Sequence, residues 1–292
     1  MKVFFRCPDG EQQRILKCWT ECRMGRRCAP LAYLKACAEQ RAWTGKPSVT
    51  QLLNGTRLSY LLLTTDQTVS PDDLAFQTVG TGAHLSLQRR GGDGSEVGIE
   101  YEGITGIFDY VEQWGDETVL WDYKVVGSYA VAKAIGMTAQ KKPLLNEDGE
   151  QMMWHGKPRT LTSFSIDPDQ RDLKDWARQV NFYRIAHERG ENLTVHHMFI
   201  WAVVRDGGTI IAKQRGIDHN TYLIDVPVLD DQTIIDYFTA KRDALMGALE
   251  HGVVPAQCTR EEAWDGNRCK NYCPVSEECK KLGCTYLKGG DE

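Results

Sequence analysis

The alternation of apolar and polar positions is clearest between residues 103 and 124. Residues 104–111 alternate apolar side chains with small or polar ones, and residues 118–123 are again mostly apolar. Gly115 and Asp116 stand between the two runs and form a dipeptide that is typical of tight turns. The pattern predicts two paired strands joined by a turn, and we take this hairpin as the centre of the fold.

Other stretches repeat apolar residues with the period of a helix and are bounded by capping residues, glycine or proline. The predicted helices cover residues 30–43, 48–55, 81–88, 129–135, 167–190 and 231–252, and a further helix start is predicted at residues 70–73. More strands are predicted at residues 195–204, 209–213 and 222–228, and an insertion loop at the polar residues 141–158. We therefore expect an α/β protein with a central mixed sheet flanked by helices.

Composition indicates the class of protein but not the molecule that it binds. The chain has 292 residues, of which 41% are hydrophobic and 26% charged, which is typical of a globular protein with one large or two small domains. No apolar run is long enough to cross a bilayer, and MKVFFRCPDG lacks the pattern of a secretory signal, so we expect a cytoplasmic protein with no membrane partner. The net charge of -5 still leaves room for a local basic groove.

The predicted hairpin contains two carboxylates and one amine. Asp109 lies in the first strand, and Asp122 and Lys124 lie at the end of the second. Because side chains alternate across a strand, Asp122 and Lys124 point to the same face and Tyr123 points away. Acids on paired strands can hold a hard divalent cation and place the amine beside a metal-bound water, which is the chemistry of phosphodiester hydrolysis. The alternative is an exposed hairpin with ordinary surface charges.

Three further side chains occur in an order that fits such a site. His84 lies in a predicted helix upstream, and Gln179 and Tyr183 lie one helical turn apart on a helix downstream. Each of these residues taken alone is common in a helix that packs on a core or faces solvent. Their order along the chain, with the two aspartates and the lysine between them, carries more information than any single member.

These pieces resemble the RecB-like branch of the PD-(D/E)XK nucleases. The matching segments are TGAHLSL, GIFDYV, WDYK and QVNFY, within about residues 80–190. The resemblance implies a restriction-endonuclease-like core, the central mixed sheet with helices around it. It also implies Mg²⁺ or Mn²⁺ bound by His84, Asp109, Asp122 and the backbone carbonyl of Tyr123. An imidazole ligand would favour Mn²⁺ over Mg²⁺.

The same resemblance implies roles for the remaining members of the motif. Lys124 would orient or help deprotonate the attacking water, and Gln179 and Tyr183 would steady the substrate strand or the lysine. We therefore expect a metal-dependent deoxyribonuclease, an exonuclease on single strands or duplex ends. The alternatives are a structure-specific endonuclease with the same chemistry and, from another class, a nucleic-acid-binding or adaptor module that does not cleave.

The cysteines are confined to the two ends of the chain. All ten fall within the first 37 or the last 35 residues. Two quartets share the spacing C-x10-C-x3-C-x5-C, and Cys37 and Cys284 are left over. In a reducing compartment such clusters are metal ligands more often than disulfides, and four thiolates suit zinc or an iron-sulfur cluster. The first quartet is Cys7, Cys18, Cys22 and Cys28, and the second is Cys258, Cys269, Cys273 and Cys279.

The second quartet also resembles a known arrangement. CRISPR-associated RecB-like exonucleases and the nuclease part of the AddAB helicase-nucleases carry a [4Fe-4S] cluster on one leading cysteine and three trailing ones. Cys269, Cys273 and Cys279 look like the trailing trio, and Cys28 looks like the leading member. Either each quartet binds its own metal, or Cys28 crosses over to join the C-terminal trio. We expect a [4Fe-4S] cluster at the C-terminal cysteines and a second cluster or Zn²⁺ at the N-terminal ones.

The predicted domain organisation follows from the cysteines. Residues 1–45 and 253–292 would form a cysteine-rich cap, and residues 46–252 the nuclease core, with an insertion at about residues 139–165. The expected partners are DNA and, by the resemblance, recombination, repair or CRISPR adaptation proteins. Aromatic and basic side chains near the cysteines could contact a strand or could be ordinary solvated surface residues. These are Trp19, Arg23, Arg26, Arg27, Trp264, Arg268, Lys270 and Tyr272.

Overall fold

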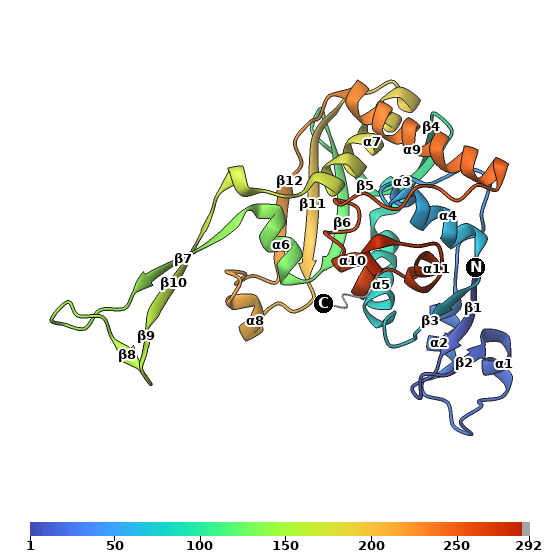
Figure 1. Ribbon diagram of the computed structural model, residues 1–292. Coiled ribbons are helices and arrows are strands. Elements are labelled where there is room, and N and C mark those ends of the chain that lie inside the picture. Colours follow the sequence, from blue (N-terminus) through green and yellow to red (C-terminus); the bar gives the residue numbers. More distant parts are fainter. Residues whose placement is uncertain (288–292) are drawn as a thin grey trace. The chain divides into compact units, whose positions relative to one another are not determined.

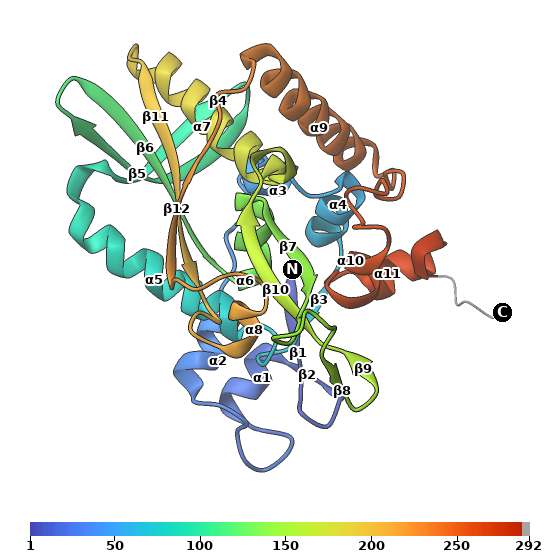
Figure 2. The ribbon, with the colours of Figure 1, turned by 90° about the vertical axis from the view of Figure 1, so that its left-hand side faces the viewer.

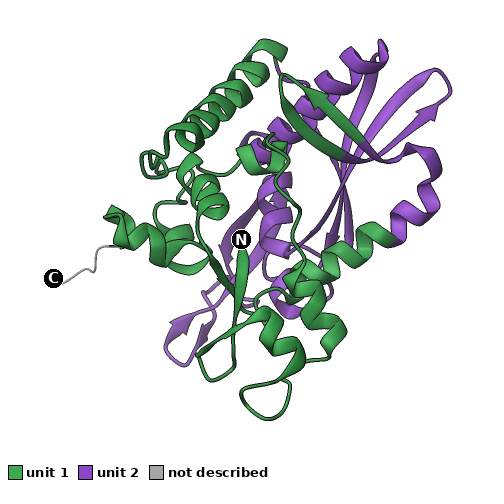
Figure 3. Cartoon of the chain, turned by 90° about the vertical axis from the view of Figure 1, so that its right-hand side faces the viewer, with its two compact units in different colours: residues 1–85, 98–107, 230–292 green, residues 86–97, 108–229 purple. Residues whose placement is uncertain are grey.

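The computed structural model describes residues 1–287 and divides the chain into two compact units that are interleaved in sequence (Figure 3). Unit 1 comprises residues 1–85, 98–107 and 230–292, and unit 2 comprises residues 86–97 and 108–229. The predicted cap segments, residues 1–45 and 253–292, both fall in unit 1. No helix among the described residues is both long enough and apolar enough to cross a membrane.

A mixed five-stranded sheet runs in the order β12-β11-β6-β5-β4. Its strands are β4 (Ser95–Tyr101), β5 (Ile104–Trp114), β6 (Glu117–Val126), β11 (Val195–Val204) and β12 (Thr221–Asp225). β11 is parallel to β6, whereas β12 pairs with β11 and β5 pairs with β6 in the antiparallel direction. The predicted α/β class with a central mixed sheet is confirmed.

β5 and β6 form the hairpin that the sequence predicts. Their register runs from Tyr110 opposite Trp121 to Trp114 opposite Glu117, on either side of the Gly115-Asp116 turn. β6 is bordered by β5 and β11, and its residues Val119 and Leu120 are fully buried. Apolar side chains on both faces are typical of a strand that is covered on both sides.

Two helices in unit 2 pack on this sheet. α6 (Ser128–Ile135) contacts β11 and β12, and α7 (Lys174–Glu191) contacts β11. The predicted helix over residues 167–190 starts later than expected. Asp167 caps a separate 3-10 turn, η2 (Pro168–Gln170), and α7 begins only at Lys174.

The predicted insertion loop is instead a structured β arm, which Figure 1 shows as two long strands leading to a small hairpin. β7 (Met137–Pro143) pairs with β10 (Thr160–Ile166), and β8 (Met153–Trp154) pairs with β9 (Lys157–Pro158). Most of these residues are exposed, so the strands lack the apolar face that would have marked them in the sequence.

The predicted strand at residues 209–213 is wrong. These residues form the short helix α8 (Ile210–Lys213), in which the hydroxyl of Thr209 accepts a hydrogen bond from the backbone N–H of Ala212. That capping bond satisfies one of the backbone N–H groups that have no partner in the first turn of a helix. An apolar run with β-branched residues gives no sign of this bond in the sequence. The neighbouring predictions hold, since β11 matches residues 195–204 and β12 covers most of residues 222–228.

Unit 1 has a helical part around α9 (Asp231–His251), with Asp230 as N-cap and Gly252 as C-cap. The sequence predicts a cap at Asp230 or Asp231 and an end near Gly252, and the structure selects Asp230. α9 packs against α3 (Val49–Leu52) and α4 (Thr56–Thr64). Gly55, predicted as a helix end, is the N-cap of α4, which the sequence pattern missed. After α9 come α10 (Asn267–Asn271), α11 (Ser276–Lys281) and η3 (Thr285–Leu287), and both ribbon views place α10 and α11 near α4 (Figures 1 and 2).

The N-terminal part of unit 1 contains small elements around a small core. β1 (Lys2–Arg6) pairs with β2 (Gln12–Arg14) and with β3 (Gln67–Val69), and the helices α1 (Ile15–Thr20) and α2 (Leu31–Ala38) follow. A longer helix, α5 (Ala75–Gly91), leads to the 3-10 turn η1 (Gly92–Gly94). α5 continues through the helix predicted at residues 81–88 and is divided between the two units.

The packing of α7 predicts a pH dependence of stability. His187 is 7% exposed and its ring meets the Phe108 ring edge-on at 5.0 Å. Burial lowers the pKa of His187 below the ordinary 6.5, although Glu191 and Glu188 partly oppose this shift. The unfolded chain therefore binds the proton more readily, so the free energy of unfolding should decrease as pH falls below about 6.5. Denaturant titrations between pH 5.5 and 7.5 measure this change.

A matched pair of variants isolates the contribution of His187. His187→Phe should flatten the decline, whereas His219→Asn should keep the wild-type dependence because His219 is exposed. An equal decline in the wild-type protein and in His187→Phe would show that other groups cause it.

Candidate functional site

The centre of the candidate site is an ion pair on β6. The Nζ atom of Lys124 lies 2.5 Å from Oδ2 of Asp122. The Asp122 side chain is 2% exposed and that of Lys124 is 18% exposed. Both side chains leave the same face of the strand, as their spacing of two residues predicts. A buried carboxylate is costly unless a charge or a hydrogen-bond donor meets it, and here the ammonium group does so.

α7 adds two polar side chains to this pair. Lys124 Nζ donates a hydrogen bond of 3.2 Å to Oε1 of Gln179, and Nε2 of Gln179 donates one of 3.0 Å to the hydroxyl of Tyr183. Gln179 and Tyr183 are both buried and lie one helical turn apart. The structure thus joins four of the predicted residues in one row of contacts, from Asp122 through Lys124 and Gln179 to Tyr183.

Asp109 meets β6 at the next residue. Its Oδ2 accepts a hydrogen bond of 2.6 Å from the backbone N–H of Tyr123. This contact lies just beyond the last backbone pair of the β5 and β6 register, Tyr110 opposite Trp121. The side chain of Tyr123 leaves on the other face, where its ring meets that of Trp201. Burial, followed by the nearby Asp109, raises the pKa of the Tyr123 phenol to about 12, so the phenol stays neutral at physiological pH.

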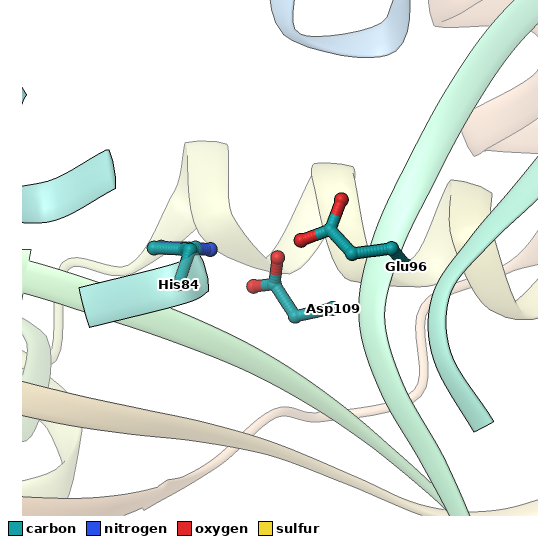
Figure 4. A group of neighbouring side chains, drawn as sticks. All are labelled: His84, Glu96 and Asp109. Carbon is teal, nitrogen blue, oxygen red and sulfur yellow. The ribbon is translucent and has the colours of Figure 1, made fainter. Parts of the chain in front are cut away.

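A possible cation site lies at the carboxylate of Asp109. His84, Glu96 and Asp109 each offer one ligand atom, and these atoms all lie within 4.8 Å of one another (Figure 4). Two carboxylates and an imidazole suit a divalent cation such as Mn²⁺. Of the predicted ligands, His84 and Asp109 belong to this group, whereas Asp122 and Tyr123 lie at the adjoining part of β6.

Sequence reasoning missed Glu96. It lies two residues after the glycine-rich break at residues 91–94 and has a φ of 52°, which is rare for a residue that is not glycine. Such a conformation costs of order 1–3 kcal/mol, so the surrounding structure must hold Glu96 in it. The available signal was an acid two residues after a glycine-rich break, which has no periodicity.

A second group of side chains forms an apolar pocket in unit 1. Five cysteines line it: Cys258, Cys269, Cys273, Cys279 and Cys284. Leu58 and Leu61 of α4 contribute to the same wall, and Val275 lies between the cysteines in sequence. Cys284, which the sequence pattern left over, is 2% exposed here.

Burial raises the pKa of four pocket thiols, those of Cys258, Cys269, Cys273 and Cys279. It raises the pKa of Cys269 to about 12, with Cys284 and the other pocket cysteines adding to the shift, and that of Cys279 to about 11. The guanidinium of Arg57, from α4, reaches within 3.8 Å of the Cys279 sulfur and partly opposes the second shift. The pocket therefore holds several cysteine sulfurs in apolar surroundings, and the guanidinium of Arg57 lies near one of them.

Cys28, the expected leading ligand of this pocket, lies with the N-terminal cysteines. It interacts with Cys7 and Cys18, and it is not among the described residues that line the pocket. Cys258 instead reaches the pocket beside α4, since a Cβ added to Gly55 would lie 2.4 Å from its sulfur. Among the described residues, the pocket thus contains all four cysteines of the second quartet together with Cys284, and which cysteines share a metal stays a prediction.

The basic and aromatic residues near the cysteines fall into two groups. Arg23 pairs with Asp9, Arg27 donates to the backbone carbonyl of Trp19, and Arg268 donates to Asn54, so these guanidinium groups have partners within the protein. Trp264 and Tyr272 are 50% and 66% exposed, with ring centroids 5.9 Å apart. The Arg268 guanidinium also lies over the Trp264 ring, 5.2 Å from its centroid.

Comparisons with known proteins give no functional assignment. No protein-family model matches the chain, and no curated protein matches it. One solved structure, described as "Crystal structure of SSO0001", aligns with 86% of this chain and 93% of its own length, at 15% sequence identity and a TM-score of 0.40. A likeness this weak supports no statement about activity.

The geometry around Glu96 predicts divalent cation binding. Glu96→Gln keeps the size of the side chain but removes a charged ligand, so the affinity for Mn²⁺ should fall at least about 10-fold. Calorimetric titration of the metal-free protein with Mn²⁺ measures the change. Glu147→Gln is the matched control, because Glu147 is exposed on the β arm. Equal Mn²⁺ affinity in Glu96→Gln and the control would remove Glu96 from the site.

Proposed function

We propose that this protein is a metal-dependent DNA nuclease that hydrolyses phosphodiester bonds, as an exonuclease on single strands or duplex ends. The observation that carries the proposal is the row of contacts from Asp122 through Lys124 and Gln179 to Tyr183, with Asp109 bonded to the same strand. The resemblance to RecB-like PD-(D/E)XK nucleases links these positions in one motif. Its finer implications, a restriction-endonuclease-like core and a cysteine cap, belong to the proposal.

The lysine is held where a nucleophilic water could be oriented. Asp122 and Gln179 contact its Nζ atom from two sides, and Tyr183 fixes the amide of Gln179. A positioned amine of this kind can align the water or take part in its proton transfer. Its positive charge also favours the approach of a phosphate and the charge that develops on the phosphate oxygens.

Three carboxylates and one histidine are the candidate holders of the cation. Glu96, Asp109 and His84 offer atoms within 4.8 Å of one another, and Asp122 adjoins them through the neighbouring Tyr123. This donor set fits Mn²⁺ or Mg²⁺, with the imidazole favouring Mn²⁺. When bound, such an ion polarises the phosphate and lowers the pKa of a coordinated water.

The cysteine pocket fits a [4Fe-4S] cluster. Such a cluster takes four thiolates, and the pocket offers five cysteines with apolar residues around them. The guanidinium of Arg57 would offset part of the negative charge of the thiolates. The role we assign to the pocket is structural, because thiolate ligation would tie α10 and α11 to the segment that begins at Cys258.

Nuclease activity is the direct test of the proposed site. Wild-type protein with Mn²⁺ should convert end-labelled single-stranded DNA to short products, and Asp122→Asn and Lys124→Ala should each slow this reaction by at least about 10²-fold. DNA binding should persist in both variants, because each removes one group from a buried site. Single-turnover assays and filter binding measure the two quantities.

Two exposed residues in unit 2 supply the matched controls. Asp116→Asn, in the hairpin turn, and Lys142→Ala, in the β arm, should cleave at the wild-type rate. A circular single strand should stay intact if the enzyme needs an end, and its cleavage would make the protein an endonuclease. Full activity of Asp122→Asn and Lys124→Ala would overturn the site assignment.

The pocket has its own test, which does not depend on activity. Anaerobically purified protein should contain about four iron atoms per chain and absorb visible light. Gly55→Ala should lower the iron content, because the new methyl group would lie 2.4 Å from the Cys258 sulfur. Gly82→Ala is the matched control, since a Cβ there meets no atom within 4 Å. Iron-free wild-type protein would contradict the cluster.

A further inference from the structure

One face of the central sheet carries a row of aromatic side chains. The ring centroid of Trp121 on β6 lies 5.1 Å from that of Phe199 on β11 and 5.9 Å from that of Trp114 on β5. Leu223 of β12 continues the row, because the strand register sets it opposite Trp201. We call this surface the aromatic face, and its members are Trp114, Trp121, Tyr123, Phe199, Trp201 and Leu223.

The aromatic face is exposed at both of its edges. Trp114 is 44% exposed and Leu223 is 56% exposed, and Trp121, Tyr123 and Trp201 between them are partly exposed. Contiguous apolar surface of this kind often marks a site of protein–protein contact, and tryptophan and tyrosine are enriched at such sites. The aromatic face thus has the composition of an interface.

Carboxylates border the aromatic face. One oxygen of Glu112 accepts hydrogen bonds of 2.8 Å from the indole N–H groups of two tryptophans of the face. Glu117 lies 3.0 Å from the ring of His197 and its side chain is 53% exposed, and Asp225 is exposed on β12. Among the described strand residues that share this face, there is no lysine or arginine. The charge therefore favours a partner with basic side chains.

The β arm offers basic side chains together with apolar ones. Lys141, Lys142, Lys157 and Arg159 are all exposed, whereas the three acids of the arm lie together in the turn at residues 147–150. Five apolar side chains of the arm are each more than half exposed. They are Leu145, Met153, Trp154, Leu161 and Ile166.

The β arm is packed at its base and exposed beyond it. At the base, Phe164 and Met137 lie against Gly216, where an added Cβ would be 2.7 Å from the Phe164 ring. Farther out, β7 and β10 form a two-stranded ribbon, which Figure 1 shows running away from the sheet. Such a ribbon is marginally stable in water unless it packs on another surface. Because the arm and the aromatic face are both exposed in one chain, neither covers the other within it.

We propose that two copies of this chain associate by exchanging arms, with the β arm of each copy lying on the aromatic face of the other. Both surfaces belong to unit 2, and they match in apolar content and are opposite in charge. A two-fold pair makes this contact twice, so each copy buries both of its exposed surfaces. The association rests on neither the proposed nuclease activity nor the proposed cluster, since Lys124 points to the opposite face of β6.

Other contacts account for only part of these features. A nucleic acid would meet the basic side chains of the arm, but its phosphates would leave Leu161 and Ile166 exposed and would be repelled by the acids of the aromatic face. Two aromatic faces in contact would bring together Glu117 and Asp225 of both copies, which is unfavourable for like charges. Arm-on-face contact covers both apolar surfaces and pairs unlike charges.

Sedimentation equilibrium of the full-length chain tests the proposal. Wild-type protein at micromolar concentration should have the mass of two chains. An arm variant, Lys141→Glu with Lys157→Glu, and a face variant, Glu117→Lys with Asp225→Lys, should each weaken association at least about 10-fold, because each brings like charges into contact. An equimolar mixture of the two variants should recover the dimer. In the mixture, the acidic arm meets the basic face and the basic arm meets the acidic face.

A double variant in unit 1 supplies the matched control. Lys17→Glu with Lys270→Glu changes the net charge as the arm variant does, at exposed positions outside both surfaces, and should sediment like the wild type. Circular dichroism verifies that each variant is folded. A monomeric wild type, variants that stay dimeric, or a mixture that stays monomeric would each overturn the proposal.

Hydrogen exchange locates the contact without any substitution. On dilution of the wild-type protein to the monomer, amides of residues 137–166 and 221–225 should exchange faster, whereas those of α9 should not change. Unchanged exchange of the arm on dilution, with protection by a single-stranded oligonucleotide instead, would overturn the proposal and assign the arm to nucleic acid. Neither readout depends on nuclease activity, so failure here would leave the nuclease proposal standing.

Discussion

The ion pair between Lys124 and Asp122 is the interaction on which the candidate site depends. Asp122 is 2% exposed in a strand bordered by β5 and β11, so its charge has little access to water. A buried carboxylate costs several kcal/mol if it is not compensated, and the ammonium group at 2.5 Å compensates it. A protein with hydrophobic residues of similar volume in place of such a pair would often be equally stable. Stability alone therefore does not explain why this pair is buried here.

The surrounding elements hold the pair in one geometry. β11 and β5 fix the backbone of β6 from both sides, and α7 presents Gln179 to the lysine. The backbone N–H of Tyr123 donates a hydrogen bond to the carboxylate of Asp109 and not to a backbone carbonyl. This contact brings a second carboxylate next to β6. Rigid strands and a helix, rather than loops, thus position the polar groups, as precise chemistry requires.

The sequence predicted the elements with strong periodicity and missed those without it. The β5 and β6 hairpin was foreseen, as was a cap of α9 at Asp230 or Asp231, because alternation and capping are local signals. The β arm was missed because its strands are exposed on both faces, and α8 because a short β-branched run resembles a strand. Glu96 escaped because its position depends on a left-handed backbone turn.

The cysteines show a different limit of sequence reasoning. Both quartets have the same spacing, so spacing alone could not decide whether Cys28 joins the C-terminal trio. Only the tertiary structure shows that Cys258 lines the pocket beside Gly55 and that Cys28 is not among the described residues that line it. Identical patterns at the two ends of one chain are thus placed in different surroundings, one a pocket and the other an exposed turn.

The proposed nuclease site requires that Lys124 and the acids around it act on a phosphodiester. The most direct measurement is a crystal structure with Mn²⁺ and a phosphorothioate oligonucleotide, in which anomalous scattering locates the ion. We expect an Mn²⁺ peak at the carboxylates of Glu96 and Asp109, with a backbone phosphate beside it and the Lys124 amine facing that phosphate. An ion bound elsewhere, or an oligonucleotide that lies away from β6, would contradict the account.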